Sequence, residues 1–192
     1  MKEIVLATKN KNKVKEIRKI LRGLPIRILF IKDLPDVIED RKTLKGNAVK
    51  KAKEIAKYTN KTALADDSGL EVKALNNKPG IKSARFAGPK CNYMDNNKKL
   101  LRLMKNKTNR NATFKCVMAL ATPKGKTTTV LGIVKGTIST KMQGKNGFGY
   151  DPVFIYPPYN KTFAQIPLKT KNKISHRALA LEKIRQIIEK MR

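Results

Sequence analysis

Apolar positions in the first third of the chain follow two different periods. Short apolar runs bounded by polar residues, such as IVLA near the start, are typical of buried strands. Between two such runs, Val14, Ile17 and Leu21 recur at helical spacing, and a glycine and a proline soon afterwards end that helix. The pattern predicts strands at residues 4–7, 26–31 and 62–65, and helices at residues 14–21 and 43–58.

The period changes in the second half of the chain, where two long runs of strand-forming residues follow one another. Pro123-Lys124-Gly125 lies between these runs and predicts a hairpin turn. Because helices and strands mix and one antiparallel pair is included, we expect an α/β or α+β fold with a long mixed sheet. No linker or repeat divides residues 1–192, which predicts a single domain. The pattern predicts a helix around residues 100–104, strands at 112–121 and 127–138, and a last helix at 175–191.

Charge adds a functional constraint. The 192 residues include 44 Lys and Arg against 14 Asp and Glu, a formal net charge of +30. A field of this sign favours polyanions such as phosphates, nucleic acid or an acidic membrane face. The two cysteines, Cys91 and Cys116, are too few for a disulfide framework, and no apolar run reaches the ~18 residues of a membrane span. We therefore expect a cytoplasmic protein with reduced thiols and no membrane partner.

A polar segment after the first predicted strand is a candidate phosphate site. A helix begins there, and a helix N-terminus offers free N–H groups and a positive dipole end to phosphate. The alternative is a capped and solvated helix start. The candidate residues are Thr8, Lys9, Asn10, Lys11, Asn12 and Lys13.

Two adjacent carboxylates, Asp66 and Asp67, are the sharpest local signal in a chain that is poor in acidic residues. Neighbouring carboxylates repel each other, so ionising both needs a cation or strong donors. Mg²⁺ takes hard oxygen ligands and often bridges carboxylates to substrate phosphates. The following Ser68 and Gly69 leave an ordinary turn as the alternative.

Two further segments carry residues suited to a nucleotide base. Phe148, Gly149, Tyr150 and Asp151 lie in a glycine-rich stretch, where aromatic rings can stack on a base and a carboxylate can read its N–H edge. The alternative is a tight turn with aromatic side chains in the core. Ser175-His176-Arg177 begins the last helix and suits an anion, or it caps that helix. Zinc-ligand spacing, nucleophile elbows and Walker-type loops are absent from the sequence.

Taken together, six stretches in this order resemble the inosine triphosphate pyrophosphatase family, whose members hydrolyse deaminated purine nucleoside triphosphates. Any one of them is a weak signal, but the ordered set spans nearly the whole chain. The stretches are ATKNKNKVKEI near the start, NAVKKA at residues 47–52, ALADDSGLEV, PGIKSARFAG, NGFGYDPVF and ISHRALAL.

The resemblance implies an elongated α/β fold, in which a mixed central sheet with flanking helices forms two lobes around a cleft. It implies a homodimer and a Mg²⁺-dependent reaction in which a nucleoside triphosphate and water give the monophosphate and pyrophosphate. Asp67 would be the proton acceptor and a metal ligand with Asp66, and Ser68 would lie beside the substrate. Residues 8–13 and Lys51 would hold phosphate. The base pocket would comprise Phe148, Gly149, Tyr150, Asp151, Lys171, His176 and Arg177.

The sequence departs from the family pattern at acidic positions. Gly46 stands where a glutamate metal ligand is expected, and Lys73 and Gln165 stand where acidic residues are more common. Asp66 and Asp67 are then the main carboxylate pair, and either Glu39 or Asp40 would compensate for the missing one.

Two other functions remain open at this point. One is a related pyrophosphatase acting on modified pyrimidine or other nucleotides, for which the base pocket is decisive. The other is a basic nucleic-acid-binding protein without catalysis, which the net charge favours. Aromatic residues make up only 6% of the chain, too few for a broad base-stacking surface. Non-specific nucleic-acid binding at low salt is expected whatever the function.

Overall fold

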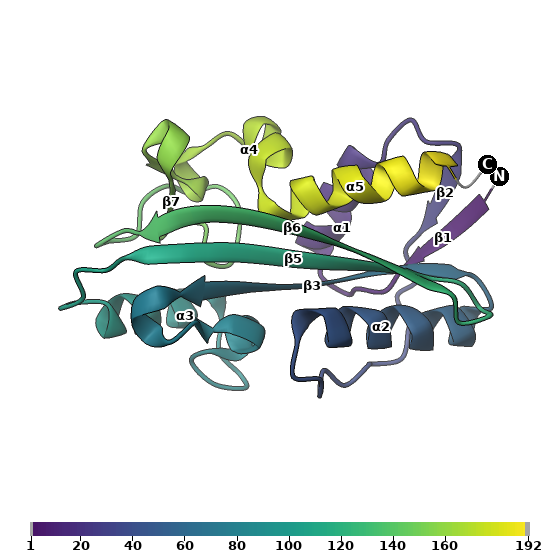
Figure 1. Cartoon of the computed structure of the whole chain (residues 1–192), viewed down its shortest axis with the longest axis horizontal. Helices are drawn as coiled ribbons and strands as arrows, with labels where there is room; N and C mark the ends of the chain where they lie inside the picture. The colour runs from purple at the N-terminus through teal and green to yellow at the C-terminus, as the bar shows by residue number, and fades with distance from the viewer. Residues whose placement is uncertain (1, 191–192) are drawn as a thin grey trace. The chain divides into compact units, whose positions relative to one another are not determined.

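The computed structural model describes residues 2–190 (Figure 1). By contact density the chain divides into two compact units. Unit 1 comprises the chain up to Asp67, Cys116–Gly132 and the segment from Arg177 on. Unit 2 comprises Ser68–Lys115 and Ile133–His176. The resemblance implied two lobes, and the chain does divide in two; the cleft stays a prediction.

The strands form one mixed sheet in the order β2-β1-β3-β5-β6-β7-β8, with β4 paired to β3. β1 runs parallel to both β2 and β3, whereas β7 is antiparallel to β6 and β8. This arrangement confirms the predicted α/β fold with a long mixed sheet. The strands are β1 (Lys2–Leu6), β2 (Ile26–Leu29), β3 (Thr62–Val72), β4 (Lys78–Pro79), β5 (Asn111–Ala121), β6 (Thr127–Ile138), β7 (Phe154–Tyr156) and β8 (Lys161–Thr162).

Five α-helices and four short 3₁₀ helices complete the described chain. None of the helices within residues 2–190 is long and apolar enough to cross a membrane. The α-helices are α1 (Lys11–Ile20), α2 (Leu44–Thr59), α3 (Tyr93–Leu103), α4 (Leu168–Ile174) and α5 (His176–Lys190). The 3₁₀ helices are η1 (Lys73–Leu75), η2 (Gly80–Arg85), η3 (Pro157–Tyr159) and η4 (Phe163–Gln165).

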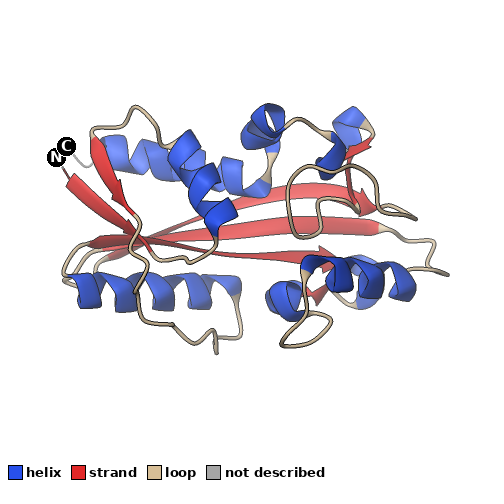
Figure 2. Ribbon diagram, turned by 180° about the vertical axis from the view of Figure 1, so that it is seen from behind, coloured by secondary structure: helices blue, strands red, loops and turns tan. Residues whose placement is uncertain are grey.

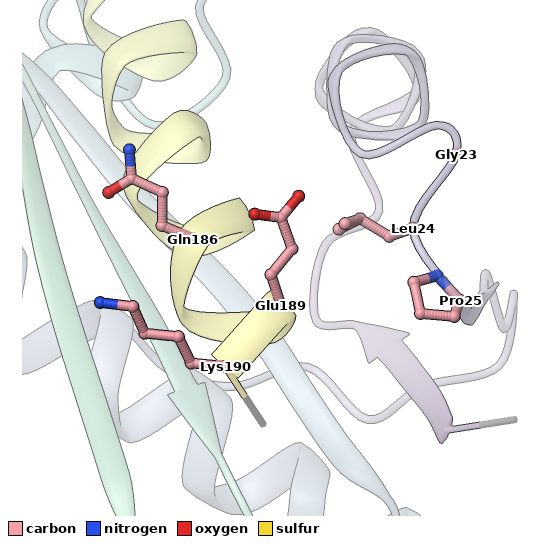
Figure 3. A pocket seen from close by; sticks show the side chains of 6 residues that line it. All are labelled: Gly23, Leu24, Pro25, Gln186, Glu189 and Lys190. Atoms are coloured by element: carbon pink, nitrogen blue, oxygen red, sulfur yellow. The ribbon is translucent and has the colours of Figure 1, made fainter. Parts of the chain in front are cut away.

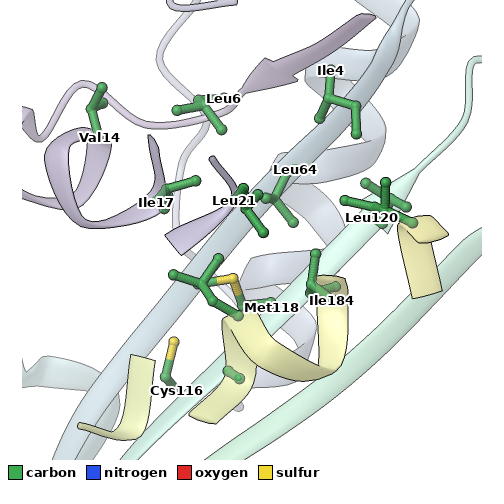
Figure 4. Close-up of a cluster of buried hydrophobic side chains, with 13 residues drawn as sticks. Ile4, Leu6, Val14, Ile17, Leu21, Leu64, Cys116, Met118, Leu120 and Ile184 are labelled. Atoms are coloured by element: carbon green, nitrogen blue, oxygen red, sulfur yellow. The ribbon is translucent and has the colours of Figure 1, made fainter. Parts of the chain in front are cut away.

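In unit 1, α1 and α5 cover one face of the strands and α2 covers the other (Figures 1 and 2). The apolar stripes of α1 and α5 meet side chains of β1, β3 and β5 in one buried cluster, drawn in Figure 4. Burial of such stripes is the main source of stability for amphipathic helices. Members of the cluster include Leu6, Ile17, Leu64, Met118 and Ile184.

Unit 2 has its own core, in which aromatic rings dominate. The rings of Phe114, Phe154 and Phe163 lie within 4.5–6.0 Å of one another, centroid to centroid. Leu100 of α3 and Met104, the residue that caps the end of α3, are fully buried in the same cluster. This core fixes α3 and the segment around residue 150, both of which matter for the candidate site.

Most predicted elements are confirmed, with one correction that bears on the site. Strand β3 continues to Val72, so Asp66, Asp67 and Ser68 lie inside a strand and not at its end or in a turn. Gly69 is required there because a Cβ at this position would lie 2.4 Å from the Gly80 carbonyl oxygen. Helix α3 begins earlier than its apolar residues indicated, and α4, β4, β7 and β8 were not predicted. The last helix is described to Lys190, so its predicted end at Met191 lies outside the described residues.

Candidate active site

Asp66 lies at the centre of a buried charge network in unit 1. Its Oδ2 atom is 2.9 Å from the Lys13 ammonium and accepts a hydrogen bond of 3.3 Å from Nε of Arg177. The Arg177 guanidinium also donates to Glu16 at 2.7 Å. Although burial opposes ionisation, the charges of Lys13 and Arg177 hold the pKa of Asp66 well below its usual range. The carboxylate at position 66 is therefore ionised and bound by two cations.

Asp67, one residue further along β3, has a different environment. Its Oδ2 accepts a hydrogen bond of 3.1 Å from the amide of Asn47, a side chain that is 1% exposed in the first turn of α2. Burial raises the pKa of Asp67 to about 6 and Glu39 adds to the rise, against the opposing effects of Lys51 and the Asn47 hydrogen bond. A carboxylate with a pKa near neutrality is suited to accept a proton at physiological pH.

Lys51 is the cation nearest to these carboxylates from α2. Its ammonium lies 2.5 Å from Oε1 of Glu39. Burial disfavours the charged ammonium, but Asp66, Asp67 and Glu39 outweigh that effect and raise the pKa of Lys51. Lys51 is therefore held in its charged form among three carboxylates.

Glu39 and Asp40, the two residues that could compensate for the glutamate absent at position 46, have different environments. Asp40 pairs with Lys50 at 2.9 Å, and its side chain is half-exposed. The charge of Glu39, in contrast, raises the pKa of both Asp67 and Lys51. A Cβ at Gly46 would lie 2.8 Å from Cβ of Arg41, so a side chain there would meet this arginine. Of the two, Glu39 is therefore the acidic residue whose charge acts on Asp67.

The predicted phosphate segment forms the start of α1. Asn10 is the N-cap, and its Oδ1 accepts from the backbone N–H groups of Asn12 and Lys13 at 2.9 and 3.3 Å. Oγ1 of Thr8 accepts from the Asn10 N–H at 3.2 Å. These bonds form a capped helix start, and the Lys13 ammonium lies against Asp66. Phosphate binding by this segment stays a prediction. Two further lysines of this segment are exposed: Lys9 and Lys11.

The carboxylates of unit 1 fit a divalent cation that completes its coordination with other ligands. Oδ1 of Asp66 is buried and has no hydrogen-bond partner within residues 2–190. Asp67 follows Asp66 on β3, and the charge of Glu39 acts on Asp67. The described residues form no cluster of three or more metal-ligating side chains. A divalent cation that binds substrate phosphate commonly takes only one or two carboxylates from the protein and completes its coordination with water.

In unit 2, the glycine-rich loop is closed by a buried ion pair. Oδ2 of Asp151 lies 2.5 Å from the Lys171 ammonium and accepts the Phe148 N–H at 2.7 Å. Both charged side chains are 3% exposed. The Lys171 ammonium also lies 5.0 Å from the centroid of the Phe148 ring. One aromatic face, one ammonium and one carboxylate are therefore held together.

Tyr150 contributes to the core of unit 2. Its side chain is buried and its hydroxyl donates to the Ser83 carbonyl oxygen at 2.9 Å. Gly149 has a φ of +64°, and Gly147 has a φ of +77°. A Cβ at Gly147 would also collide with the Asp151 carboxylate. Tyr150 and the two glycines thus shape the loop and present Phe148.

Two other predicted site residues, Ser68 and His176, are the first and last residues of unit 2. Ser68 is half-buried on β3. His176 is buried and stacks on Phe114, with ring centroids 4.4 Å apart and an interplanar angle of 7°. His176 therefore packs on an aromatic core residue.

Sequence reasoning named Asp66, Asp67, Lys13 and Lys51, which lie near one another in unit 1. It assigned Arg177 to the base pocket, whereas the structure pairs Arg177 with Asp66 and Glu16. It also missed two partners of these residues. Glu16 is a buried anion on α1, and Asn47 is the hydrogen-bond donor to Asp67. Asn47 was visible in the NAVKKA stretch, although its position there does not reveal its partner. For Glu16, the sequence offered one indication of burial, which is that this charged residue lies beside the apolar stripe of α1.

Pockets within each unit lie apart from these residues. In unit 1, a surface pocket of about 430 Å³ lies between the loop at residues 23–25 and the end of α5 (Figure 3). In unit 2, a pocket of about 490 Å³ is lined by residues including Leu75, Phe86 and Leu103. Neither pocket is lined by a predicted site residue.

Comparison with known proteins gives a consistent result along the whole chain. A family profile described as the Ham1 family matches residues 4–187. A protein of Desulforamulus reducens named dITP/XTP pyrophosphatase is 44% identical over 194 residues, covering 98% of this chain and 96% of that protein. A protein of Syntrophobacter fumaroxidans with the same name is 48% identical over 181 residues, covering 93% of this chain and 78% of that protein.

Solved structures agree with the sequence matches. A HAM1 protein from Coxiella burnetii superposes with a TM-score of 0.93 at 38% identity, covering 99% of this chain and 100% of that one. The Ham1 protein of Staphylococcus aureus superposes with a TM-score of 0.90 at 41% identity, with full coverage of both chains. The resemblance identified from the ordered motifs is thereby confirmed, and the chain belongs to the Ham1 family.

Proposed function

We propose that the protein hydrolyses deaminated purine nucleoside triphosphates, dITP, ITP and XTP, to the monophosphate and pyrophosphate, and so removes them from the nucleotide pool. The observation that carries this proposal is the similarity over 93–98% of this chain, at 44–48% identity, to proteins named dITP/XTP pyrophosphatase. The charge clusters of the two units provide the chemistry that this reaction needs.

The residues of unit 1 suit the triphosphate. Attack of water on the α-phosphorus builds negative charge on the phosphoryl oxygens, and breaks the bond to the bridging oxygen that leaves with pyrophosphate. Lys13 and Lys51 are held as cations beside the carboxylates, where they can offset this charge. The polar turn at residues 8–12 offers further donors to phosphate.

Asp67 serves as the proton acceptor for the attacking water. Its hydrogen bond from Asn47 fixes the carboxylate, because Asn47 is in turn held by accepting the Arg41 N–H at 2.9 Å. Asp66 cannot share this role, since Lys13 and Arg177 stabilise its ionised form so strongly that it remains a poor base. Two neighbouring carboxylates thus have different environments and different roles.

Membership of the family suggests a divalent metal, and we assign Mg²⁺ as the ion that Asp67 and Glu39 would hold, with Asp66 available only through Oδ1. The ion supplies Lewis-acid stabilisation of the phosphoryl oxygens when bound. Glu39 also keeps Lys51 in place through their 2.5 Å contact.

The residues of unit 2 suit the base. The Phe148 ring offers a stacking face, and the Lys171 ammonium beside it is a donor for the 6-oxo group of hypoxanthine or xanthine. Adenine carries an amino group at this position, which cannot accept from Lys171. A buried donor facing that group would lose its hydrogen bond, which disfavours adenine.

We expect dITP and XTP to be preferred over dATP and dGTP in kcat/KM. Against dATP, one unpaired buried group costs ~1–3 kcal/mol, a preference of about 5- to 150-fold. Guanine keeps the 6-oxo group, so dGTP tests selection at its 2-amino group instead. The measurement is pyrophosphate release with Mg²⁺ across these four substrates, with the nucleotide product identified. Equal values for all four would refute the proposal, and release of phosphate with a diphosphate product would indicate a phosphatase. Preference for a pyrimidine triphosphate would favour the alternative pyrophosphatase.

Replacing Glu39 with glutamine tests the metal assignment. We expect E39Q to raise the Mg²⁺ concentration at half-maximal rate by about tenfold or more, since even outer-shell partners of metal sites contribute about 10- to 100-fold. The matched control is Asp40→Asn, whose carboxylate pairs with Lys50 instead. An equal Mg²⁺ requirement in both variants would remove Glu39 from the metal site.

Two partner predictions stay as proposals. Homodimer formation is tested by light scattering of the purified protein over a range of concentrations. Non-specific nucleic-acid binding is expected from the +30 net charge and should disappear by ~0.2 M salt. Binding that persists at higher salt would favour the nucleic-acid-binding alternative.

A further inference from the structure

A buried asparagine outside the predicted site contacts the glycine-rich loop of unit 2. Asn97 lies on α3 and is 2% exposed. Its Nδ2 atom donates two hydrogen bonds of 2.8 Å, to the carbonyl oxygens of Tyr93 in its own helix and of Gly149 in the loop. Since both neighbours are acceptors, the orientation of the amide is fixed by its contacts.

A contribution to fold stability does not by itself explain why a buried amide occupies position 97. Oδ1 of Asn97 is buried without a hydrogen-bond partner in the described part of the chain, and an unsatisfied buried acceptor is costly. The Tyr93 carbonyl oxygen lies within the same helix, so the hydrogen bond that it accepts from the Asn97 side chain does not connect α3 to another segment. The bond to Gly149, 52 residues away in sequence, is what the amide specifically provides.

The loop needs such an anchor because of its glycines. Gly147 and Gly149 both have positive φ, and glycine gives a segment access to many other conformations. Phe148 lies between them. The same face of α3 makes a second contact with the loop, because the Tyr93 ring, four residues before Asn97, lies 5.9 Å from the Phe148 ring at an angle of 42°.

The start of α3 is itself well fixed. Asn92 and Asp95 form a reciprocal capping box. The side chain of each residue accepts one hydrogen bond of 3.0 Å from the backbone N–H of the other. A capped first turn places Tyr93 and Asn97 in a defined register. Helix α3 therefore offers a rigid surface on which both the Phe148 ring and the Gly149 peptide rest.

We propose that Asn97 is a positioning residue for base recognition, which holds the Gly149 peptide so that the Phe148 ring keeps its place beside Lys171 and Asp151. This inference rests on the proposed function, in which these three side chains receive the base. Asn97 acts through the loop and not by touching the substrate.

The test compares Asn97→Leu with Asn96→Leu, its neighbour on the same helix. Asn96 is also 2% exposed, but its amide bonds the Ala84 carbonyl oxygen and the Ala87 N–H, away from the loop. Both variants remove a buried amide of the same size. We expect N97L to raise KM for dITP and XTP by about tenfold while kcat changes by less than about threefold, the pattern of lost binding. Hydrogen exchange at residues 147–151 should also become faster.

The control separates positioning from simple destabilisation. N96L removes two hydrogen bonds to the backbone, at the Ala84 carbonyl oxygen and the Ala87 N–H, and should lower the melting temperature at least as much as N97L. It should nevertheless keep KM within about twofold and leave exchange at residues 147–151 unchanged, since destabilisation alone reduces the active fraction and not KM. Equal KM effects in both variants, or an unchanged KM in N97L, would overturn the inference while the proposed function stands.

Hydrogen exchange keeps the two claims distinguishable. If the wild-type protein hydrolyses neither dITP nor XTP, the proposed function fails, and the anchoring of the loop is then judged by exchange alone. Faster exchange at residues 147–151 in N97L but not in N96L supports the anchor, and equal exchange overturns it.

Discussion

Replacing Asp67 with asparagine should reduce turnover of dITP by about 10²-fold or more, the scale of losing a general base. The amide keeps the shape of the side chain and can still accept the hydrogen bond from Asn47. It cannot take a proton from water or offer a full negative charge to a metal. Steady-state kinetics with saturating Mg²⁺ measure the loss, and circular dichroism checks that the fold is retained.

The same substitution should stabilise the metal-free protein at high pH. The folded-state pKa of Asp67 is raised from 3.8 to about 6, so the ionised carboxylate is disfavoured in the folded protein. This penalty is absent below about pH 4 and grows to its full size above about pH 6, where two pKa units correspond to about 3 kcal/mol at most. Denaturant unfolding in EDTA should therefore show D67N gaining stability between pH 4 and pH 8.

Asp33→Asn provides the control for both measurements, since Asp33 is an exposed carboxylate on a loop. It should leave turnover and the pH dependence of stability unchanged. Near-normal turnover of D67N with an unchanged circular dichroism spectrum would remove Asp67 from the reaction.

Replacing Lys171 with methionine should destabilise unit 2 strongly. The Asp151 carboxylate would stay buried without the ammonium 2.5 Å away that neutralises it. Removing one partner of a buried ion pair typically costs ~3–5 kcal/mol, whereas replacing both is often close to neutral. We therefore expect the double variant K171M/D151N to recover most of the stability that K171M loses, as measured by urea unfolding.

The double variant K171M/D151N should recover stability but not the preference for dITP over dATP. The Lys171 ammonium is the proposed donor to the 6-oxo group, so the preference for dITP over dATP should remain reduced. Lys173→Met, at an exposed position of the same helix, should change neither property. A double variant as unstable as K171M would show that the pair is not the source of the loss.

Elements defined by local signals were predictable from the sequence. The spacing of Val14 and Ile17 and the polar cap at Asn10 describe α1 without reference to the rest of the chain. Strand β3 was predicted too short because Asp66 and Asp67 resemble turn residues. They are accommodated in a buried strand by Lys13, Arg177 and Asn47, three partners brought in by folding from distant parts of the chain.

Candidate residues with conspicuous chemistry could be named from the sequence, and their inconspicuous partners could not. Paired carboxylates and a glycine-rich aromatic stretch stand out in any sequence. Asn97 and Asn47 are single polar residues in helices, and their importance lies in one hydrogen bond each to Gly149 and to Asp67. Such bonds depend on the packing of whole helices, which a linear pattern does not encode.

The contribution of α5 to unit 1 has a consequence for the order of events during protein synthesis. Arg177 neutralises both Asp66 and Glu16, and Leu181, Ile184 and Ile188 complete the core that begins at Ile4. While translation is still upstream of residue 177, the nascent chain contains these carboxylates without their guanidinium partner and an apolar surface without its cover. A chain truncated before residue 177 would thus have an amino-terminal part that cannot complete its core, and proteases would recognise it by its exposed apolar residues.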